Sequence, residues 1–410
     1  MSALSHIRVL DLSRVLAGPW AGQLLGDLGA EVIKVERPGS GDDTRHWGPP
    51  YIKDAQGNDS AEAAYFQSAN RNKQSLTVDF TQAEGQRLIR ELAAQCDVVL
   101  ENFKVGGLAA YGLDYAALKA VNPKLIYCSI TGFGQDGPYA DLQAYDDVIQ
   151  GMSGLADLME QQGGEARYLP TIAADKTCGH VAAHAILAAL WQRERTGEGA
   201  FVEVPMFESM VGFNLVEHFY GQHFEPPRSA PGYPRVLAPW RRPYHTADGL
   251  VAMMPYTNLH WQRFFAEVGA PQHADDPRFS DIASRTAHIA ELLELASTYV
   301  RRQPTAYWLA TCERLEIPAA PVARLAELRA DEHLLATGFF EELQDAAMGT
   351  LRFPGVAVRF DGQRPPVTMA PRLGEHTRAL LAEVGLDAAQ VQALIDQGAA
   401  IAPQHKDADT

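Results

Sequence analysis

The chain has few cysteines, too few basic residues to balance its acidic ones, and no long apolar run, and each shortage excludes a class of protein. Its 410 residues include four cysteines, far apart and without a Cys-x-x-Cys pair, so neither a metal site nor a redox disulfide is expected. Lysine and arginine total 35 against 51 acidic residues, a formal net charge of −16. Nucleic acid and anionic membranes attract proteins with a positive field. We therefore expect neither as a partner.

The sequence also shows no signal for membrane insertion or secretion. No stretch approaches the ~18 consecutive apolar residues of a membrane helix. The opening MSALSHIRVLDLSRV has no charged region followed by an apolar one. We expect a cytoplasmic protein. With 46% apolar and 21% charged residues, a chain of this length can bury a large core, and two domains are the natural expectation.

The N-terminal third alternates short apolar, β-branched runs with helical patterns. Strands that are apolar on both faces are typical of a parallel sheet covered by helices. Right-handed crossovers would make it a doubly wound, Rossmann-like α/β domain. Strands are expected at Val9–Leu12, Glu31–Val35, Leu76–Phe80, Val98–Glu101 and Leu125–Ile130, and helices at Trp20–Leu28 and Ala83–Gln95.

Further along, a helix is expected over Thr177–Arg195 and a strand over Phe201–Val204. A proline-rich stretch then indicates a linker or an irregular crossing. Beyond it the pattern predicts a small α+β domain, and the C-terminal part again shows strand and helix patterns. These later elements are a strand at Leu250–Met254, helices at Asn258–Val268, Ala287–Arg302 and Thr305–Arg314, a strand-like zone at Gly349–Phe360, and helices at Arg372–Val384 and Ala388–Gln397.

The first strand, turn and helix have the outline of a dinucleotide-binding unit. In such units a glycine-rich turn lets backbone N–H groups meet a phosphate. Gly18, Gly22, Gly26 and Gly29 are spaced by three, three and two residues, so the Gly-x-Gly-x-x-Gly pattern is absent. Close packing of a helix on the sheet is the simpler explanation of these glycines, and a nicotinamide-dependent dehydrogenase stays open as an alternative of another class.

Six motifs in order resemble the class III CoA-transferases, the family of formyl-CoA transferase and the carnitine dehydratase/bile-acid-inducible proteins. They are LDLSRVLAGPWAGQLLGDLGAEVIKVERPGSGDDTRHWGPP, NRNKQSLTVDF, DVVLENFKVGGLAAYGLDY, IYCSITGFGQDGPY, AADKTCGHVAAHAILAALWQRERTGEGAFVEVPMFES and APRLGEHTRALLAEVGL. They cover nearly the whole chain. The resemblance implies that CoA moves from an acyl-CoA to a small carboxylic acid, with CoA as part of the substrate and no metal.

The same resemblance implies the domain organisation. Family members are interlocked homodimers whose large domain contains both ends of the chain. Residues 1–205 are expected to form the first part of the CoA-binding Rossmann-like domain, and 206–225 a linker. Residues 226–330 would form the small domain, and 331–410 the return linker and the C-terminal part of the large domain.

Asp175 is the candidate nucleophile. It follows an apolar run and precedes a helical pattern, so on the residues alone it is expected to be a helix N-cap. The resemblance places it at the catalytic aspartate of the family, in AADKTCG. A carboxylate near the positive end of a helix is expected to stay ionised, with exposed N–H groups nearby to stabilise a developing oxyanion. The implied mechanism runs through aspartyl anhydrides and an aspartyl-CoA thioester.

The resemblance also implies a CoA site, which an acidic protein must build from local cations and apolar slots. The implied residues are Val15, Leu16, Ala17, Arg37, Val78, Asn102, Phe103, Lys104, Thr131 and Phe133. Three positions depart from the formyl-CoA transferases, because Leu16 replaces a glutamine, Ala110 an arginine and Thr131 a lysine. Lys104 and Lys73 are candidates to compensate for the lost phosphate ligands.

An acyl-CoA racemase of the same fold is the nearest rival function. Racemases of this kind use a histidine before an aspartate in an AGHD-like segment to remove the proton next to the thioester. Here the segment reads QAYDDV, with Tyr145 before Asp146, so the imidazole is absent. His180 and His184 lie one helical turn apart, but no third ligand accompanies them, so helix-face histidines are the expectation.

Overall fold

The computed structural model describes residues 2–53, 57–346 and 348–402, which form two compact units. The first contains Met1–Ser153, Pro170–Val211 and His333–Thr410, and the second contains Gly154–Leu169 and Gly212–Glu332. Residues 154–169, which the predicted boundaries include in the large domain, cluster here with the second unit. Residues 403–410 of the predicted large domain lie outside the described residues.

A six-stranded parallel sheet is the centre of the first unit. The strand order is β5-β2-β1-β6-β7-β8, so β1 lies between β2 and β6, and the chain changes direction of winding there. This is the strand order of a Rossmann-like doubly wound fold, which confirms the predicted fold class. The strands are β1 (Arg8–Asp11), β2 (Glu31–Glu36), β5 (Lys73–Thr77), β6 (Val98–Glu101), β7 (Ile126–Thr131) and β8 (Ala200–Pro205).

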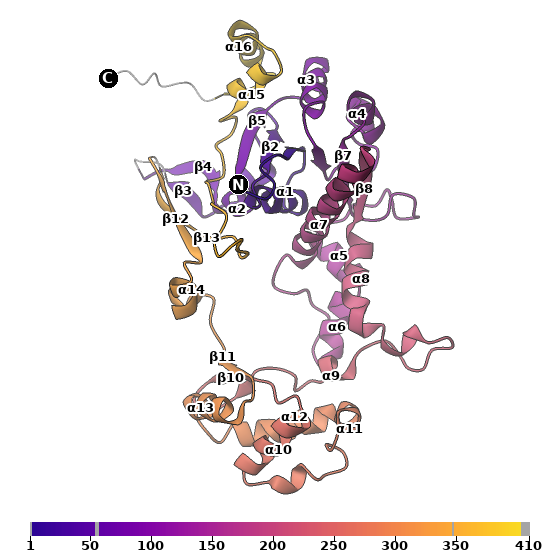
Figure 1. The fold of residues 1–410 in the computed structure, drawn as a ribbon, viewed down its shortest axis with the longest axis vertical. Helices are drawn as coiled ribbons and strands as arrows, with labels where there is room; N and C mark the ends of the chain where they lie inside the picture. Colours follow the sequence, from indigo (N-terminus) through magenta and orange to yellow (C-terminus); the bar gives the residue numbers. More distant parts are fainter. Residues whose placement is uncertain (1, 54–56, 347, 403–410) are drawn as a thin grey trace. The chain divides into compact units, whose positions relative to one another are not determined.

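Helices cover both faces of this sheet. On one face α3 (Ala83–Ala93), α4 (Tyr115–Val121), α15 (Thr377–Glu383) and α16 (Ala388–Asp396) enclose a core of leucine, isoleucine and valine side chains. On the other face α1 (Ala17–Asp27) packs against the long helix α7 (Ala173–Thr196), as Figure 1 shows. A Cβ at Gly179 of α7 would lie only 2.8 Å from the Ala17 carbonyl oxygen, so glycine permits this close approach.

The second unit has its own core and a three-stranded antiparallel sheet. Strand β10 (Leu250–Met253) lies between β9 (Tyr244–His245) and β11 (Ala319–Pro321). Helices α10 (Asn258–Glu267), α12 (Ile289–Val300) and α13 (Thr305–Leu315) enclose an aromatic core that includes Trp261, Phe264, Phe265 and Trp308. The predicted small α+β domain is therefore present.

Strand β13 (Gly349–Pro354) lies within the strand-like zone predicted at Gly349–Phe360, whereas the other elements described next have no counterpart among the predicted ones. Two antiparallel hairpins, β3–β4 and β12–β13, belong to the first unit, and α8 begins where a linker over 206–225 was expected. The bounds are β3 (Tyr51–Lys53), β4 (Asp59–Ala63), α2 (Ala64–Ala69), α5 (Asp146–Met152), α6 (Leu155–Gln161), α8 (Met206–His218), α9 (Pro234–Leu237), α11 (Ile282–Ala287), α14 (Glu332–Ala336), β12 (Phe340–Asp345) and β13 (Gly349–Pro354).

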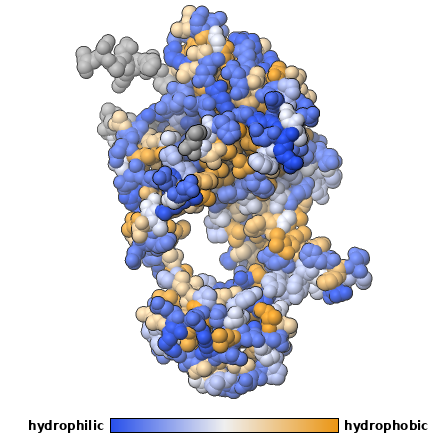
Figure 2. All heavy atoms as spheres, viewed as in Figure 1, coloured by the Kyte–Doolittle hydropathy of each residue, from blue (hydrophilic) through white to orange (hydrophobic). Residues whose placement is uncertain are grey.

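The surface mixes hydrophilic and hydrophobic residues on the face drawn in Figure 2. One hydrophobic patch lies over α8, where Phe213 and Val216 are 58% and 75% exposed. Within the described ranges, none of the helices combines the length and hydrophobicity that crossing a bilayer requires.

Candidate active site

A cavity of about 280 Å³ opens at the carboxyl ends of β1, β6, β7 and β8. Ligands of doubly wound folds bind at this edge, next to the point where the winding reverses. The loops after β1 and β6 are tied together there, since Asn102 accepts a hydrogen bond from the Arg14 N–H at 2.9 Å and donates one to the Arg14 carbonyl at 2.8 Å. The cavity brings together eight of the predicted site residues, namely Val15, Leu16, Ala17, Asn102, Phe103, Lys104, Thr131 and Asp175.

The other predicted CoA residues lie elsewhere. Arg37 and Val78 line a second cavity of about 320 Å³, and the two cavities share Arg14, Asp43, Phe103 and Lys104 as lining residues. Phe133 lines neither of them. It is buried, packs against Tyr139 and Phe207, and its carbonyl accepts a hydrogen bond from the Thr131 hydroxyl at 2.8 Å.

The second cavity has an aromatic wall. Phe80 makes edge contacts with Phe103 and Tyr111, with ring centroids 6.0 and 5.6 Å apart. The Arg14 guanidinium lies 5.4 Å from the Phe103 ring centroid. Apolar rings beside exposed cations suit a group that carries both a flat base and phosphates. The sequence patterns drew attention to Val15–Ala17 but missed Arg14, the residue before them.

Asp175 lies in the first turn of α7 but does not cap the helix, so the prediction of an N-cap is wrong. The helix begins at Ala173, its N-cap residue is Ile172, and Asp175 is the third helical residue. The carboxylate of Asp146, at the start of α5, instead accepts hydrogen bonds from the free N–H groups in the first turn of α7. Its Oδ1 accepts hydrogen bonds from the N–H groups of Ala174 at 2.7 Å and Asp175 at 3.1 Å. An isoleucine has no acceptor for these groups, so a residue distant in the sequence supplies it.

The electrostatics of Asp175 also differ from the prediction. Burial, and secondarily the nearby charge of Asp146, raise the pKa of the Asp175 carboxyl to about 7. A helix dipole typically contributes ~0.3–1 kcal/mol, which is too little to offset the loss of water around a buried carboxylate. Two of the first-turn N–H groups expected to be exposed are occupied by Asp146. At neutral pH the Asp175 carboxyl is therefore only partly ionised, whereas the sequence predicted a fully ionised carboxylate.

A tyrosine beside Asp175 was not predicted. The Tyr65 hydroxyl is buried and has no hydrogen-bond partner among the described residues. Burial, and then the charges of Asp175 and Asp146, raise the pKa of Tyr65 to about 12, so its proton is retained at neutral pH. Tyr65 makes an edge contact with Trp47, with ring centroids 5.4 Å apart. Nothing in the spacing around Tyr65 distinguishes it from a core aromatic residue.

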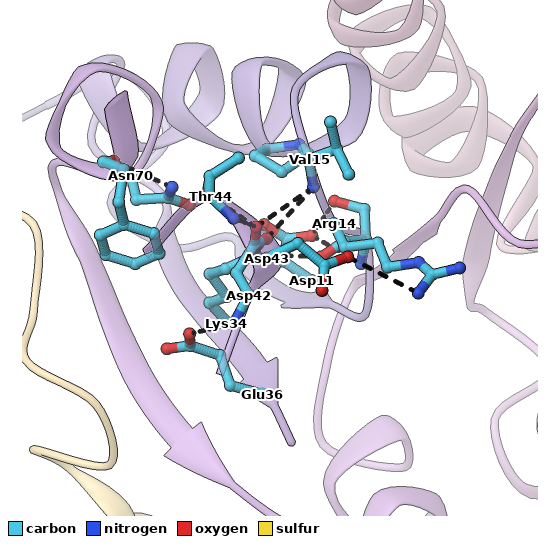
Figure 3. A network of polar contacts seen from close by, with 12 residues as sticks. Asp11, Arg14, Val15, Lys34, Glu36, Asp42, Asp43, Thr44 and Asn70 are labelled. Carbon is cyan, nitrogen blue, oxygen red and sulfur yellow. Dashed lines mark hydrogen bonds and ion pairs between the residues drawn. The ribbon is translucent and has the colours of Figure 1, made fainter. Parts of the chain in front are cut away.

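A buried ionic network holds the loop that carries Val15, as Figure 3 shows. Val15 has φ 70, a left-handed conformation that is strained for a β-branched residue. Its N–H points to the Asp42 carboxylate, with N to Oδ2 3.2 Å. The Lys34 ammonium lies 2.8 Å from Asp42 Oδ2 and donates to the Ser13 carbonyl at 3.0 Å. Because Lys34 and Asp42 are each 1% exposed, the loop is fixed before any ligand enters.

Lys73 cannot act as the phosphate ligand that the sequence suggested. Its side chain is fully buried, and its ammonium lies 2.9 Å from Asp11 Oδ2. It also donates to the Pro19 carbonyl at 2.8 Å and to Asn70 Oδ1 at 3.0 Å. All three protons of the ammonium are thereby occupied inside the domain.

Comparison with known proteins decides the family. The model of CoA-transferase family III matches residues 4–377. This chain belongs to CoA-transferase family III. The resemblance inferred from the six motifs is confirmed, and the protein is an enzyme of the class III CoA-transferases.

Curated relatives of this family III CoA-transferase carry related names. A succinate–glutarate CoA-transferase of Agrobacterium fabrum is 40% identical over 93% of this chain and 95% of its own length. The human succinyl-CoA:glutarate CoA-transferase is 34% identical over 93% of this chain and 86% of its own. A solved CAIB/BAIF family protein from Brucella suis is 37% identical, with a TM-score of 0.77 and coverage of 93% and 99% of the two chains.

The rival interpretations gain no support from the site of this CoA-transferase. Tyr145, 69% exposed, precedes Asp146, and no imidazole lines the described cavity. A Cβ at Gly22 would lie 2.8 Å from Asp11 Oδ2, so this glycine serves close packing of α1 on β1. The His184 ring nitrogen bonds the His180 carbonyl, and the described residues contain no group of three metal-ligating side chains.

Proposed function

We propose that this enzyme moves CoA from an acyl-CoA to a carboxylic acid with Asp175 as the covalent nucleophile. The observation that carries the proposal is the position of the Asp175 carboxyl in a cavity at the carboxyl ends of the strands. Most of the predicted CoA residues line the same cavity, and a second cavity that shares Phe103 and Lys104 suits the nucleotide.

The proposed reaction is a sequence of four acyl transfers. The Asp175 carboxylate attacks the acyl-CoA carbonyl, the C–S bond breaks, and a mixed anhydride and CoA thiolate form. The thiolate attacks the Asp175 acyl carbon, which releases the donor acid and leaves an aspartyl-CoA thioester. The acceptor carboxylate attacks this thioester to give a second anhydride and thiolate. The thiolate then attacks the acceptor acyl carbon and restores Asp175.

The cavity suits this chemistry because the Asp175 carboxyl in it is desolvated. A carboxyl with a pKa of about 7 is only partly hydrated, and a desolvated carboxylate is a better nucleophile than an exposed one. In this proposal Asp146 positions Asp175 by holding the first turn of α7.

CoA is proposed to span both cavities. Val15, Leu16 and Ala17 would contact it with Asn102 beside Asp175, whereas Arg37 and Val78 would contact the nucleotide. Phe103 and Lys104 line both cavities, so they would lie along the molecule between its ends. Thr131 would line the acyl end, and Phe133 would act only by packing behind it.

We propose a dicarboxylic acid as the acceptor and an acyl-CoA of the succinyl type as the donor. The support is the names of the relatives, which specify succinate and glutarate. Purified enzyme should transfer CoA from succinyl-CoA to glutarate faster than from acetyl-CoA to butyrate. The absence of transfer with every donor and acceptor in such a panel would refute the proposal.

The covalent route has a separate test. Mass spectrometry should find CoA attached to the peptide that contains Asp175, and hydroxylamine should convert that thioester to a hydroxamate. With ¹⁸O in the acceptor carboxylate, one labelled oxygen should enter Asp175 in each turnover. Transfer without the adduct and without label in this side chain would rule the route out.

The pH dependence gives a prediction for Asp146. Because the nucleophile must be ionised, kcat/KM is expected to fall as the pH drops through about 7, the pKa of Asp175. Asp146→Asn keeps an oxygen to accept from the two N–H groups but removes the like charge. The acid limb of the pH profile of kcat/KM should therefore move to lower pH by on the order of one unit in this variant. Asp146→Ala, which also removes the acceptor, should cost about 1 kcal/mol of stability. If the acid limb of Asp146→Asn coincides with that of the wild type, the charge of Asp146 does not raise the pKa of Asp175.

The proposal includes a homodimer in the cytoplasm. The exposed side chains Phe213 and Val216 of α8 support association, because exposed apolar patches of this kind mark protein contacts. Sedimentation equilibrium should give twice the mass of the chain. A monomer at micromolar concentration would contradict the expected assembly.

A further inference from the structure

The second unit contains two buried arginines without a carboxylate partner. Arg235 on α9 is 8% exposed, and Arg285 on α11 is 1% exposed. The two helices pack against each other. Buried charges are normally paired, because an unpaired one loses its hydration without compensation. Although the protein has 51 acidic residues, no carboxylate of the described ranges forms an ion pair with either guanidinium.

Arg285 is anchored but not neutralised. Its Nη1 donates to the Phe279 carbonyl at 2.9 Å and its Nη2 to Asn258 Oδ1 at 2.7 Å, whereas its buried Nε has no partner. Burial, and then the positive charge of Arg235, lower the pKa of Arg285, so the two guanidinium groups are near enough to repel each other. The carboxylate of Asp281 opposes this effect, but it caps α11 through the Ser284 N–H at 2.8 Å.

Arg235 is the more available of the two. Its guanidinium lies 5.2 Å from the centroid of the Tyr256 ring. Its side chain makes no hydrogen bond or ion pair with any residue of the described ranges, and none of its nitrogens is among the fully buried polar atoms that lack a partner. The Arg235 guanidinium is about nine-tenths buried and has no hydrogen-bond acceptor. Such a group can bind a planar anion through two parallel N–H groups.

We propose that Arg235, backed by Arg285, is a binding site for the carboxylate of a small organic acid. The anion would neutralise a pair of charges that the fold leaves uncompensated. The choice of a carboxylate rests on the proposed function, because the proposed acceptor is a dicarboxylic acid. The same chemistry has two sources, the acid that takes part in transfer and a free acid that does not.

Binding is tested first on the full chain. Glutarate at constant ionic strength should raise the Tm of the wild type in a saturable way, and calorimetry should give its Kd. Arg235→Gln should weaken glutarate binding at least tenfold, and Arg235→Lys, which keeps the charge but not the fork, should lie between. Arg302→Gln is the matched control, because Arg302 is exposed, belongs to the same unit and lies 4.6 Å from the Tyr299 ring. Equal glutarate affinity in Arg235→Gln and the wild type would overturn the proposal.

Transfer kinetics distinguish the two sources. If the anion is the substrate, Arg235→Gln should raise KM for glutarate at least tenfold and leave KM for the monocarboxylate butyrate unchanged. If it is a free acid, both KM values stay constant while the Tm response to glutarate is lost. Failure of the transferase proposal looks different, because no CoA adduct would form on Asp175 while glutarate still bound in an Arg235-dependent way.

Discussion

Asp175→Ala is expected to abolish CoA transfer while the protein stays folded and retains CoA. Removal of a covalent nucleophile leaves only the binding contributions to catalysis, so kcat should fall by at least about 10³-fold. The residues proposed to bind CoA come from the end of β7 and from the segments after β1, β2, β5, β6 and β7, whereas Asp175 belongs to α7. Initial rates with succinyl-CoA and glutarate, together with CoA titration by calorimetry, measure the two effects.

Asp175→Asn is the matched control for shape. The amide occupies the same space but cannot form the anhydride, so it should be as inactive as alanine. Burial and Asp146 raise the pKa of Asp175 to about 7, so its ionisation destabilises the fold as the pH rises from about 4 to about 7. Above pH 7 the asparagine variant should therefore be more stable than the wild type by a few kcal/mol, since each unit of pKa shift corresponds to about 1.4 kcal/mol. Substantial activity in either variant would end the assignment of the nucleophile.

Asp42→Ala is expected to cause the largest loss of stability. Asp42 pairs with Lys34, accepts from the Val15 N–H, and accepts from the N–H and hydroxyl of Thr44 at 2.9 and 2.7 Å. Breaking a buried pair leaves an uncompensated ammonium, which typically costs about 3–5 kcal/mol. Urea unfolding should show this loss. The strained φ of Val15 should also relax, so KM for the acyl-CoA should rise.

Asp42→Asn separates charge from geometry. The amide oxygen can still accept from Val15 and Thr44, so the loop should keep its conformation and KM should change less than stability. Although burial opposes it, the adjacent Lys34 and the Thr44 bonds lower the pKa of Asp42 to about 2. The ion pair thus stabilises the fold fully above about pH 4, and this stabilisation is lost as the pH falls toward 2. If the wild type and Asp42→Asn unfold in acid at the same midpoint pH, the Lys34–Asp42 ion pair does not stabilise the fold as proposed.

One physical cause explains both the strands that the sequence predicted and the strand that it misplaced. Strands β1, β6 and β7 were found because their residues are mostly apolar on both faces, as strands between two helical layers must be. The short apolar runs in β2 and in the edge strand β8 sufficed, although β2 contains Lys34 and β8 exposes Glu203. Strand β5 begins at Lys73, three residues before the predicted start at Leu76. Lys73 and Ser75 are polar but fully buried, because the carboxylates of Asp11 and Glu36 bind them. A pattern of hydropathy cannot show that a polar side chain has a buried partner.

The candidate site divides in the same way. The motifs identified Asp175 and the loop Val15–Ala17, and the structure brings them to one cavity. Tyr65 and Arg14 were missed because neither has a spacing that separates it from ordinary core or surface residues. The cap on α7 was misassigned because its acceptor, Asp146, is 29 residues from Asp175 in the chain.

The linear order of residues determined the family, the doubly wound class and the identity of the candidate nucleophile, since these depend on local periodicity and contiguous motifs. Only the tertiary structure decided how that nucleophile is charged, which lysine is buried, and which arginines lack a counter-ion. Those properties depend on desolvation and on charges brought within a few ångströms by folding, and neither can be read from distance along the chain.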